Sequence, residues 1–132
     1  MRVLKTMIAV GLMVGACTAM ATPQWVQLTG LKGGDAMFID VDSVVKSPNG
    51  RWIEYWTKMT FVKPTVPGEN GGRGLKAKYK MSCDDRMEQM VSAILYKDVD
   101  FKVVITSSND ADPAYAIPPG STKDTLREAL CK

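Results

Sequence analysis

Hydrophobic and polar residues alternate along most of the chain at the two-residue period of a β-strand. The segments that show this alternation, or are rich in β-branched and aromatic residues, are 23–30, 36–40, 51–62, 75–83, 87–96 and 100–107. The segment 87–96 alternates poorly and contains Met, Glu, Gln and Ala, so a helix is a competing interpretation there. The short turn that precedes it favours a hairpin, and we therefore expect a strand.

The two longest predicted strands each have one face that is more hydrophobic than the other. In 51–62 the more hydrophobic face carries Ile53, Tyr55, Met59 and Phe61, and the other carries Trp52, Glu54, Trp56 and Lys58. In 75–83 the hydrophobic face carries Leu75, Ala77, Tyr79, Met81 and Cys83, and the other carries Lys76, Lys78 and Lys80. The hydrophobic faces predict the core. Because large exposed aromatic residues are uncommon, we expect the terminal helix or a subunit partner to cover Trp52 and Trp56.

Turn-forming residues separate these strands. Asp42 or Ser43 can cap a single helical turn after the second strand, and prolines and glycines interrupt regular structure in the loops 63–74 and 108–120. Both loops are candidate contact surfaces, because loops held by a rigid scaffold often carry recognition, and simple connectors are the alternative.

The segment 121–132 predicts a C-terminal helix. Ser121 is a good N-cap, and Asp124 three residues later completes a pattern that resembles a capping box. The apolar stripe of this helix consists of Leu126, Ala129 and Leu130.

The first 21 residues have the composition of an export signal. Arg2 and Lys5 form a positive region, 7–16 is hydrophobic but too short to span a bilayer, and small residues at 19–21 fit a signal-peptidase site. Cleavage there divides the chain into a signal peptide, 1–21, and a domain, 22–132.

A second interpretation of the signal involves Cys17. The segment 14–17 resembles a bacterial lipobox, with Val14 where leucine is favoured, and lipidation of Cys17 would anchor the protein to a membrane. Cleavage after Ala21 would discard this cysteine, and we favour that cleavage.

Charge and composition exclude several classes of function. Loss of the signal leaves 15 basic residues against 14 acidic ones, and the chain has no recognisable nucleic-acid reading motif, so we expect no nucleic-acid partner. The chain contains no histidine, which excludes Ser-His-Asp and Cys-His catalysis and histidine-ligated metals. We expect neither a metal nor a cofactor.

Cysteine usage predicts a disulfide. Cys17 is either removed or acylated, so Cys83 and Cys131 remain as an even pair in an oxidising compartment. Two free thiols or a metal site are the alternatives, although no Cys-x-x-Cys spacing is present. Together these features predict one exported α+β domain: an antiparallel sheet of five to six strands, a C-terminal helix packed on it, and one disulfide.

The candidate binding surface consists of Lys58, Lys76, Lys78, Lys80, Trp52 and Trp56. A lysine stripe can bind acidic polysaccharide, anionic lipid or an acidic protein patch, and exposed tryptophans can bind protein or sugar. The alternative to a binding surface is a solvent-exposed strand face without a ligand, whose lysines prevent edge-to-edge aggregation.

Acidic residues cluster just after Cys83, as Asp84, Asp85 and Glu88. A hydrolytic pair or a calcium site is conceivable, but the spacing matches no known loop and aspartates are common in turns. Asp98 with Asp100 and Asp110 with Asp112 are likewise more simply explained as turn residues than as a hydrolytic pair or a calcium site. We expect no catalytic residues.

The chain resembles the surface-adhesin protein E-like family of Gram-negative envelope proteins. The segments that carry the resemblance are WVQL (25–28), MFIDVDSV (37–44), WIEYWTKMTF (52–61), KAKYKMSC (76–83), IPPGS (117–121) and LCK (130–132). The resemblance implies an antiparallel sheet, a C-terminal helix and a Cys83–Cys131 bridge.

The resemblance also implies a function. The family takes its name from a lipoprotein adhesin that binds host proteins such as vitronectin and laminin, so we expect a non-catalytic envelope binding protein, monomeric or homodimeric, in the periplasm or outer membrane. A soluble periplasmic structural or assembly factor is the alternative, and a small carboxylate-dependent hydrolase is a weaker one.

Overall fold

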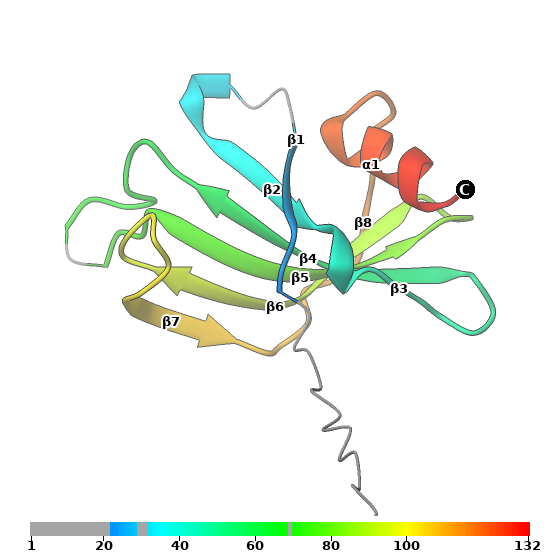
Figure 1. Ribbon diagram of the computed structural model, residues 1–132, viewed down its shortest axis with the longest axis horizontal. Helices are drawn as coiled ribbons and strands as arrows, with labels where there is room; N and C mark the ends of the chain where they lie inside the picture. The colour runs from blue at the N-terminus through cyan, green and yellow to red at the C-terminus, as the bar shows by residue number, and fades with distance from the viewer. Residues whose placement is uncertain (1–21, 29–31, 69) are drawn as a thin grey trace, which may run out of the picture.

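The computed structural model describes residues 22–28, 32–68 and 70–132 (Figure 1). The predicted signal and lipobox therefore lie outside the described residues. The strands are β1 (Trp25–Leu28), β2 (Ala36–Asp40), β3 (Val45–Lys46), β4 (Trp52–Thr60), β5 (Gly74–Ser82), β6 (Met87–Tyr96), β7 (Val104–Ser108) and β8 (Tyr115–Ala116). The helix is α1 (Thr122–Leu130), and two short 3-10 turns are η1 (Lys32–Gly34) and η2 (Val41–Ser43).

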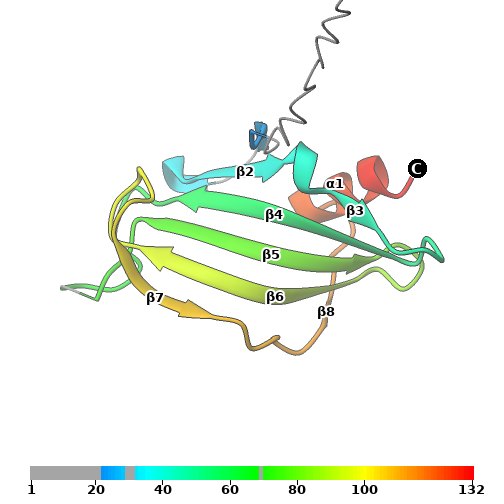
Figure 2. The same cartoon turned by 60° about the horizontal axis from the view of Figure 1, so that its bottom comes forward.

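All the strands join one antiparallel sheet. Six of them follow the order β1-β2-β4-β5-β6-β7, while β3 pairs with β4 and β8 pairs with β6 (Figures 1 and 2). The α+β class is confirmed, but the sheet has eight strands and is larger than the predicted five to six. The extra strands have two residues each, too few for any alternation to appear in the sequence.

The hydrophobic core lies between one face of the sheet and α1. Its buried residues are Ile39, Ile53, Tyr55, Met81, Ile117 and Leu126. The strand faces that were predicted to be buried supply the sheet side of this core, and Leu126 and Leu130 supply the helix side. Helix α1 therefore does not cover Trp52 and Trp56, which alternate with Ile53 and Tyr55 along β4; that part of the prediction was wrong.

Segment 87–96 is a strand, as predicted, and its poor alternation has a structural cause. The register between β5 and β6 shifts between Lys78 and Tyr79, which marks a β-bulge. Hydrophobic residues before and after the bulge consequently change face relative to a regular strand. The predicted loop 108–120 contains β8, and the last strand begins at Val104 rather than at Asp100.

The predicted helical turn after β2 is η2, but its N-cap is Asp40 rather than Asp42 or Ser43. The Asp40 carboxylate accepts a hydrogen bond from the Asp42 backbone N–H at 3.1 Å. Asp40 can cap the turn because its extended backbone ends β2, while Ser43 bonds back to the Asp40 carbonyl and accepts from Trp56 N–H.

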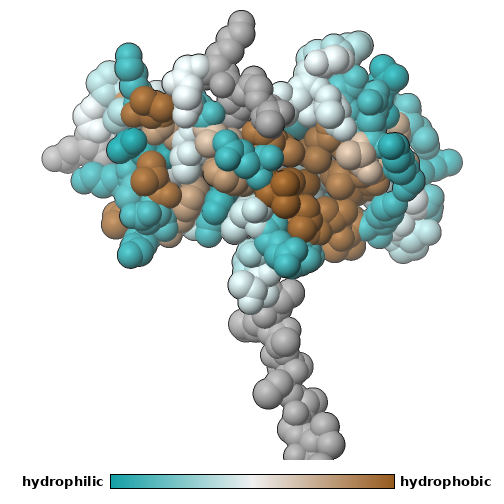
Figure 3. Space-filling model, turned by 45° about the horizontal axis from the view of Figure 1, so that its top comes forward, coloured by the Kyte–Doolittle hydropathy of each residue, from teal (hydrophilic) through white to brown (hydrophobic). Residues whose placement is uncertain are grey.

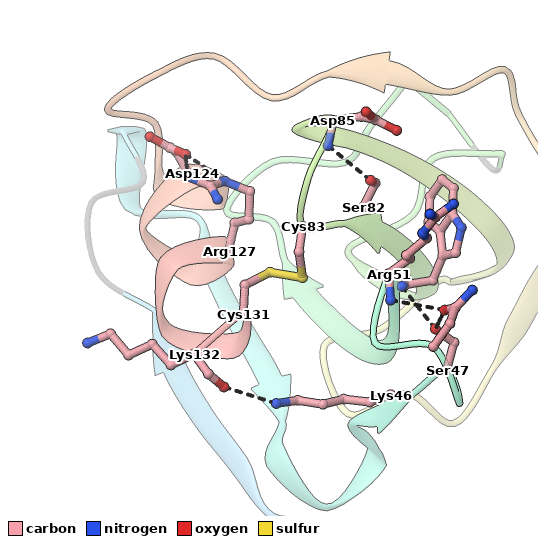
Figure 4. The surroundings of a disulfide bond; sticks show 12 residues. Lys46, Ser47, Arg51, Ser82, Cys83, Asp85, Asp124, Arg127, Cys131 and Lys132 are labelled. Carbon is pink, nitrogen blue, oxygen red and sulfur yellow. Dashed lines mark hydrogen bonds and ion pairs between the residues drawn. A yellow bond between two sulfur atoms is a disulfide. The ribbon is translucent and has the colours of Figure 1, made fainter.

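The C-terminal helix is capped as predicted and tied to the sheet by a disulfide (Figure 4). Ser121 Oγ accepts from Asp124 N–H at 3.2 Å, and the Asp124 carboxylate accepts from Gly120 N–H at 3.0 Å. Cys83 and Cys131 form the predicted disulfide, with their Cα atoms 5.7 Å apart. The bridge joins the end of β5 to the end of α1 and closes the core at that corner.

Candidate functional site

The candidate binding residues gather on the face of the sheet opposite α1, which we call the open face. Its members on β4 and β5 are Trp52, Glu54, Trp56, Lys58, Lys76, Lys78 and Lys80. The register pairs Glu54 with Lys80, Trp56 with Lys78 and Lys58 with Lys76. All these side chains are half-buried. The structure thus brings together every residue that the sequence proposed for a binding surface.

Two of the lysines have partners within the open face. Lys78 Nζ lies 3.3 Å from a Glu54 carboxylate oxygen, in a half-exposed ion pair. Lys80 Nζ lies 4.6 Å from the ring centroid of Trp52, within the range of a cation–π contact.

The other two lysines, Lys58 and Lys76, lie in a frame of aromatic rings that sequence reasoning missed. Lys58 Nζ is 4.7 Å from the Trp25 centroid, 5.1 Å from Phe38 and 5.6 Å from Phe101. Lys76 Nζ is 5.2 Å from the same Phe101 ring. The three tryptophans of the chain therefore all contribute to this face.

Only part of this aromatic frame could be predicted from the sequence. Strand alternation alone puts Phe38 on the opposite side of β2 from the buried Met37 and Ile39, but the pairing of Phe38 with Lys58 requires the β2–β4 register. Burial, and next the nearby charge of Lys76, lower the pKa of Lys58 below its usual value.

A shallow cavity lies at the other end of the open face. Its volume is about 280 Å³, and it is lined by Val45, Lys46, Ser47, Pro48, Trp52, Glu54 and Lys80. The short β3–β4 hairpin forms one wall, which gives Trp52 a pocket-like setting next to charged side chains.

A second cavity, of about 250 Å³, lies between β1 and α1. Its lining residues are Leu28, Gly120, Thr122, Thr125, Leu126 and Ala129. Figure 3 brings forward the side of the molecule with β1, β2 and α1, where hydrophobic surface gathers in patches beside hydrophilic surface. Ala129, which belongs to the predicted apolar stripe of the helix, is exposed and lines this cavity.

The candidate carboxylates do not converge. Asp84 and Asp85 are exposed in the β5–β6 turn, whereas Glu88 points into the core and has no exposed surface. Asp98 instead accepts hydrogen bonds from the backbone N–H groups of Lys102 and Val103, which hold its pKa below the usual value. Among the described residues, no group of three or more His, Cys, Asp or Glu side chains is arranged to hold a metal ion.

Glu88 is the centre of a buried polar cluster that the sequence did not reveal. Its carboxylate accepts hydrogen bonds from Tyr55 Oη at 2.5 Å and Tyr115 Oη at 2.8 Å, and it pairs with Lys123 Nζ at 2.7 Å. Lys123 Nζ also lies 3.5 Å from the Tyr79 ring centroid. This cluster connects β4, β5, β6, β8 and α1, so its chemistry fixes how the helix docks.

The three tyrosines of the cluster have raised pKa values. Burial raises the pKa of Tyr79 to about 12, with a further contribution from the negative charge of Glu88. The pKa values of Tyr55 and Tyr115 are also raised, first by burial and then by Glu88. Burial lowers the pKa of Lys123, although Glu88 partly opposes this effect.

We expect the protein to lose stability as the pH rises above the ordinary tyrosine pKa of about 10. Between that value and about 12, the folded state keeps protons on tyrosines that the unfolded state has lost, so the free energy of unfolding falls. Lys123 acts with the opposite sign, because its folded pKa is lowered, but it is one group against three. Urea unfolding at a series of pH values from 8 to 12 measures the slope.

Tyr79→Phe is the matched control for this slope. It removes one titrating hydroxyl that makes no hydrogen bond to the described part of the chain, so the alkaline loss should become shallower. A free energy of unfolding that is constant to pH 12 would contradict the assignment of neutral tyrosines around Glu88.

Fold and site together define a class of protein: a small α+β domain whose terminal helix is tied by a disulfide to one sheet face, with tryptophans and lysines on the other. The chain belongs to the surface-adhesin protein E family, whose sequence model matches residues 25–132. No curated protein sequence matches the chain significantly. Among its described residues, no helix has the length and hydrophobicity needed to cross a membrane.

Solved structures of Haemophilus influenzae protein E share this fold. One of them superposes with a TM-score of 0.60 at 11% identity, covering 83% of this chain and 89% of the other. A second crystal form of that protein gives a TM-score of 0.57 at 12% identity, covering 84% of this chain and 96% of the other. At such low identity the likeness establishes the fold and leaves binding properties to be argued from the site.

Proposed function

We propose that this protein is a non-catalytic binding protein of the cell envelope, and that it binds a protein partner through the open face. The observation that carries this proposal is the position of the half-buried Trp52 and Trp56 on the sheet face that α1 leaves uncovered. Tryptophan is the residue most enriched at the energetic centres of protein interfaces, because it buries a large area with few rotatable bonds.

The polar surroundings of these tryptophans support the same proposal. The Lys78–Glu54 ion pair and Lys80 lie next to the rings, as the polar rim of an interface does. The cavity beside Trp52 offers a place for one partner side chain. Membership in a surface-adhesin family favours a host matrix or plasma protein, such as vitronectin or laminin, as the partner.

Two further features belong to this proposal. The N-terminal 21 residues act as an export signal that is cleaved after Ala21, so the mature chain begins at Thr22 and lacks the lipid that Cys17 would otherwise carry. The absence of catalysis is supported by the separation of the carboxylates, since Glu88 is fully buried while Asp84 and Asp85 are exposed elsewhere.

Retention on immobilised vitronectin and laminin tests the proposal. We expect the oxidised protein to be retained, and the double variant Trp52→Ala/Trp56→Ala to bind at least about tenfold more weakly, because truncating two central aromatics removes the largest contact area. The matched control is Val26→Ala/Val41→Ala, which removes apolar side chains that are 49% and 40% exposed at the other edge of the sheet, where Val26 pairs with the core residue Ile39.

The outcomes separate the open face from the rest of the surface. The control should bind like the wild type. Equal binding by the tryptophan variant and the wild type would remove the open face from consideration, and lack of retention of the correctly oxidised wild type would count against host-protein adhesion altogether.

A further inference from the structure

Lys58 and Lys76 form a pair of positive charges that the fold holds together without a counterion. They lie directly opposite each other on β4 and β5, a position where like charges destabilise a sheet. In the described part of the chain, neither makes an ion pair with a carboxylate, whereas their neighbour Lys78 pairs with Glu54. The fold therefore keeps two like charges side by side at a cost, and a ligand that neutralises them would explain their placement.

An unusual backbone conformation positions the Phe101 ring of the aromatic frame next to Lys58 and Lys76. Phe101 has a positive φ of 57°, a conformation that non-glycine residues rarely adopt. The Asp98 carboxylate holds this turn by accepting hydrogen bonds from the next two backbone N–H groups. A side chain at Gly74 would approach within 2.9 Å of the Phe101 ring, so glycine is needed for the ring to lie against the sheet.

As a result, the single ring of Phe101 lies close to both lysines. Phe101 packs edge-on against Tyr96, with ring centroids 5.3 Å apart, and lies within cation–π range of Lys58 and of Lys76. Backbone strain that persists in a native structure is usually maintained by its surroundings and often marks a functional site. Here the strained residue positions a flat apolar surface next to two ammonium groups.

The chemistry of this frame indicates the ligand. Ammonium groups bind the oxygens of sulfate, phosphate and carboxylate as point charges, and flat aromatic rings pack against the C–H faces of sugars. The backbone of β4 and β5 is fully used by the sheet, so an extended peptide, which binds sheet edges through main-chain hydrogen bonds, gains little here. The row Lys76, Lys78, Lys80 repeats at about 6.7 Å, which suits a linear polyanion.

We propose that Lys58 and Lys76, with the rings of Trp25, Phe38 and Phe101, form a subsite for a sulfate group of a linear sulfated glycan. The glycan continues along β5 toward Lys78, the next lysine of that row. This site lies at the opposite end of the open face from the cavity at Trp52 and takes a different class of ligand, so it goes beyond the proposed function and does not depend on it.

The alternative is that the lysines only stabilise the fold through cation–π contacts. Each contact is a modest one at an exposed site, and this alternative predicts that removing the lysines lowers stability without affecting any ligand. A binding measurement therefore distinguishes the sulfate subsite from a purely stabilising role of the two lysines, which a stability measurement alone would not do.

Isothermal titration calorimetry with a size-defined heparin octasaccharide, at about physiological ionic strength, tests the proposal. We expect Lys58→Gln/Lys76→Gln to weaken binding at least tenfold. The charge-matched control Lys63→Gln/Lys97→Gln, which removes two exposed lysines outside the frame, should change affinity less than about threefold, because it alters only the general electrostatic attraction. Phe101→Leu keeps both charges and should weaken binding by about threefold, since stacking alone is reduced.

Four results would overturn the proposal. The first is that the wild type does not bind the octasaccharide, and the second is that the two double variants lose equal amounts of affinity. The third is that the wild type binds a desulfated, N-acetylated octasaccharide as tightly as the sulfated one. The fourth is that it binds an oligoglutamate of the same charge as tightly as the sulfated octasaccharide. The last of these would assign the site to an acidic protein segment instead. None of them bears on retention by vitronectin or laminin through Trp52 and Trp56, so the two proposals fail separately.

Discussion

Removing the disulfide is expected to lower the free energy of unfolding by about 4 kcal/mol in the variant Cys83→Ala/Cys131→Ala. The bridge closes a loop with a sequence separation of 48 residues, and its removal lets the unfolded chain explore many more conformations. Folded domains have total stabilities of about 5–15 kcal/mol, so this loss is a large fraction. Urea unfolding of the variant and the wild type, followed by circular dichroism, measures the difference.

The structure also predicts which element of the variant without the disulfide unfolds first. Helix α1 is only nine residues long, and it depends on docking against the core for its stability. The bridge closes the corner where α1 meets β5, so the helix should detach before the sheet unfolds. Hydrogen exchange should therefore accelerate in Thr122–Leu130 more than in β4 and β5. A loss below about 1 kcal/mol would show that the packed helix is held without the bridge.

The second large effect is expected at Glu88, where Glu88→Gln should cost about 3–5 kcal/mol. Glu88 is fully buried, and the substitution leaves the positive charge of Lys123 in the core region without its 2.7 Å partner. An uncompensated charge in such a position is much more costly than the loss of an exposed ion pair. Thermal and urea unfolding of the purified variant measure the change.

Two further variants make this prediction specific. Glu88→Gln/Lys123→Met removes both charges and should recover a large part of the loss, because no unpaired charge remains. Glu54→Gln breaks the half-exposed ion pair with Lys78 and should change stability by less than about 1 kcal/mol. If the double variant is less stable than Glu88→Gln alone, then Lys123 does not depend on Glu88, and the cluster does not act as a unit.

Local sequence information was sufficient where a structural feature depends on neighbouring residues. The alternation of Ile53 and Tyr55 with Trp52 and Trp56 identified the two faces of β4, because side chains in a strand alternate strictly. Ser121 identified the start of α1, since its side chain accepts a hydrogen bond from the backbone N–H of Asp124, the third residue of the helix. The disulfide followed from the count of cysteines in an exported chain.

Features that depend on strand register or on bulges were missed. Glu88 resembles a turn carboxylate in the sequence, and only the pairing of β6 with β5 and β8 places it in the core. The frame around Lys58 needs β1, β2, β4 and the Phe101 turn to meet, over distances in sequence that no local pattern reports. The helix or a subunit partner was expected over Trp52 and Trp56, because the sequence does not reveal which face of the sheet α1 covers.

The central claim is that a protein partner binds the open face. All three tryptophans contribute to that face, so fluorine NMR of protein labelled with 5-fluorotryptophan observes it directly. On titration with vitronectin or laminin, we predict that the signals of Trp52 and Trp56 change chemical shift to saturation, because line broadening alone also follows from the slow tumbling of any large complex. Unchanged signals from all three tryptophans in a preparation that the partner demonstrably retains would contradict the claim.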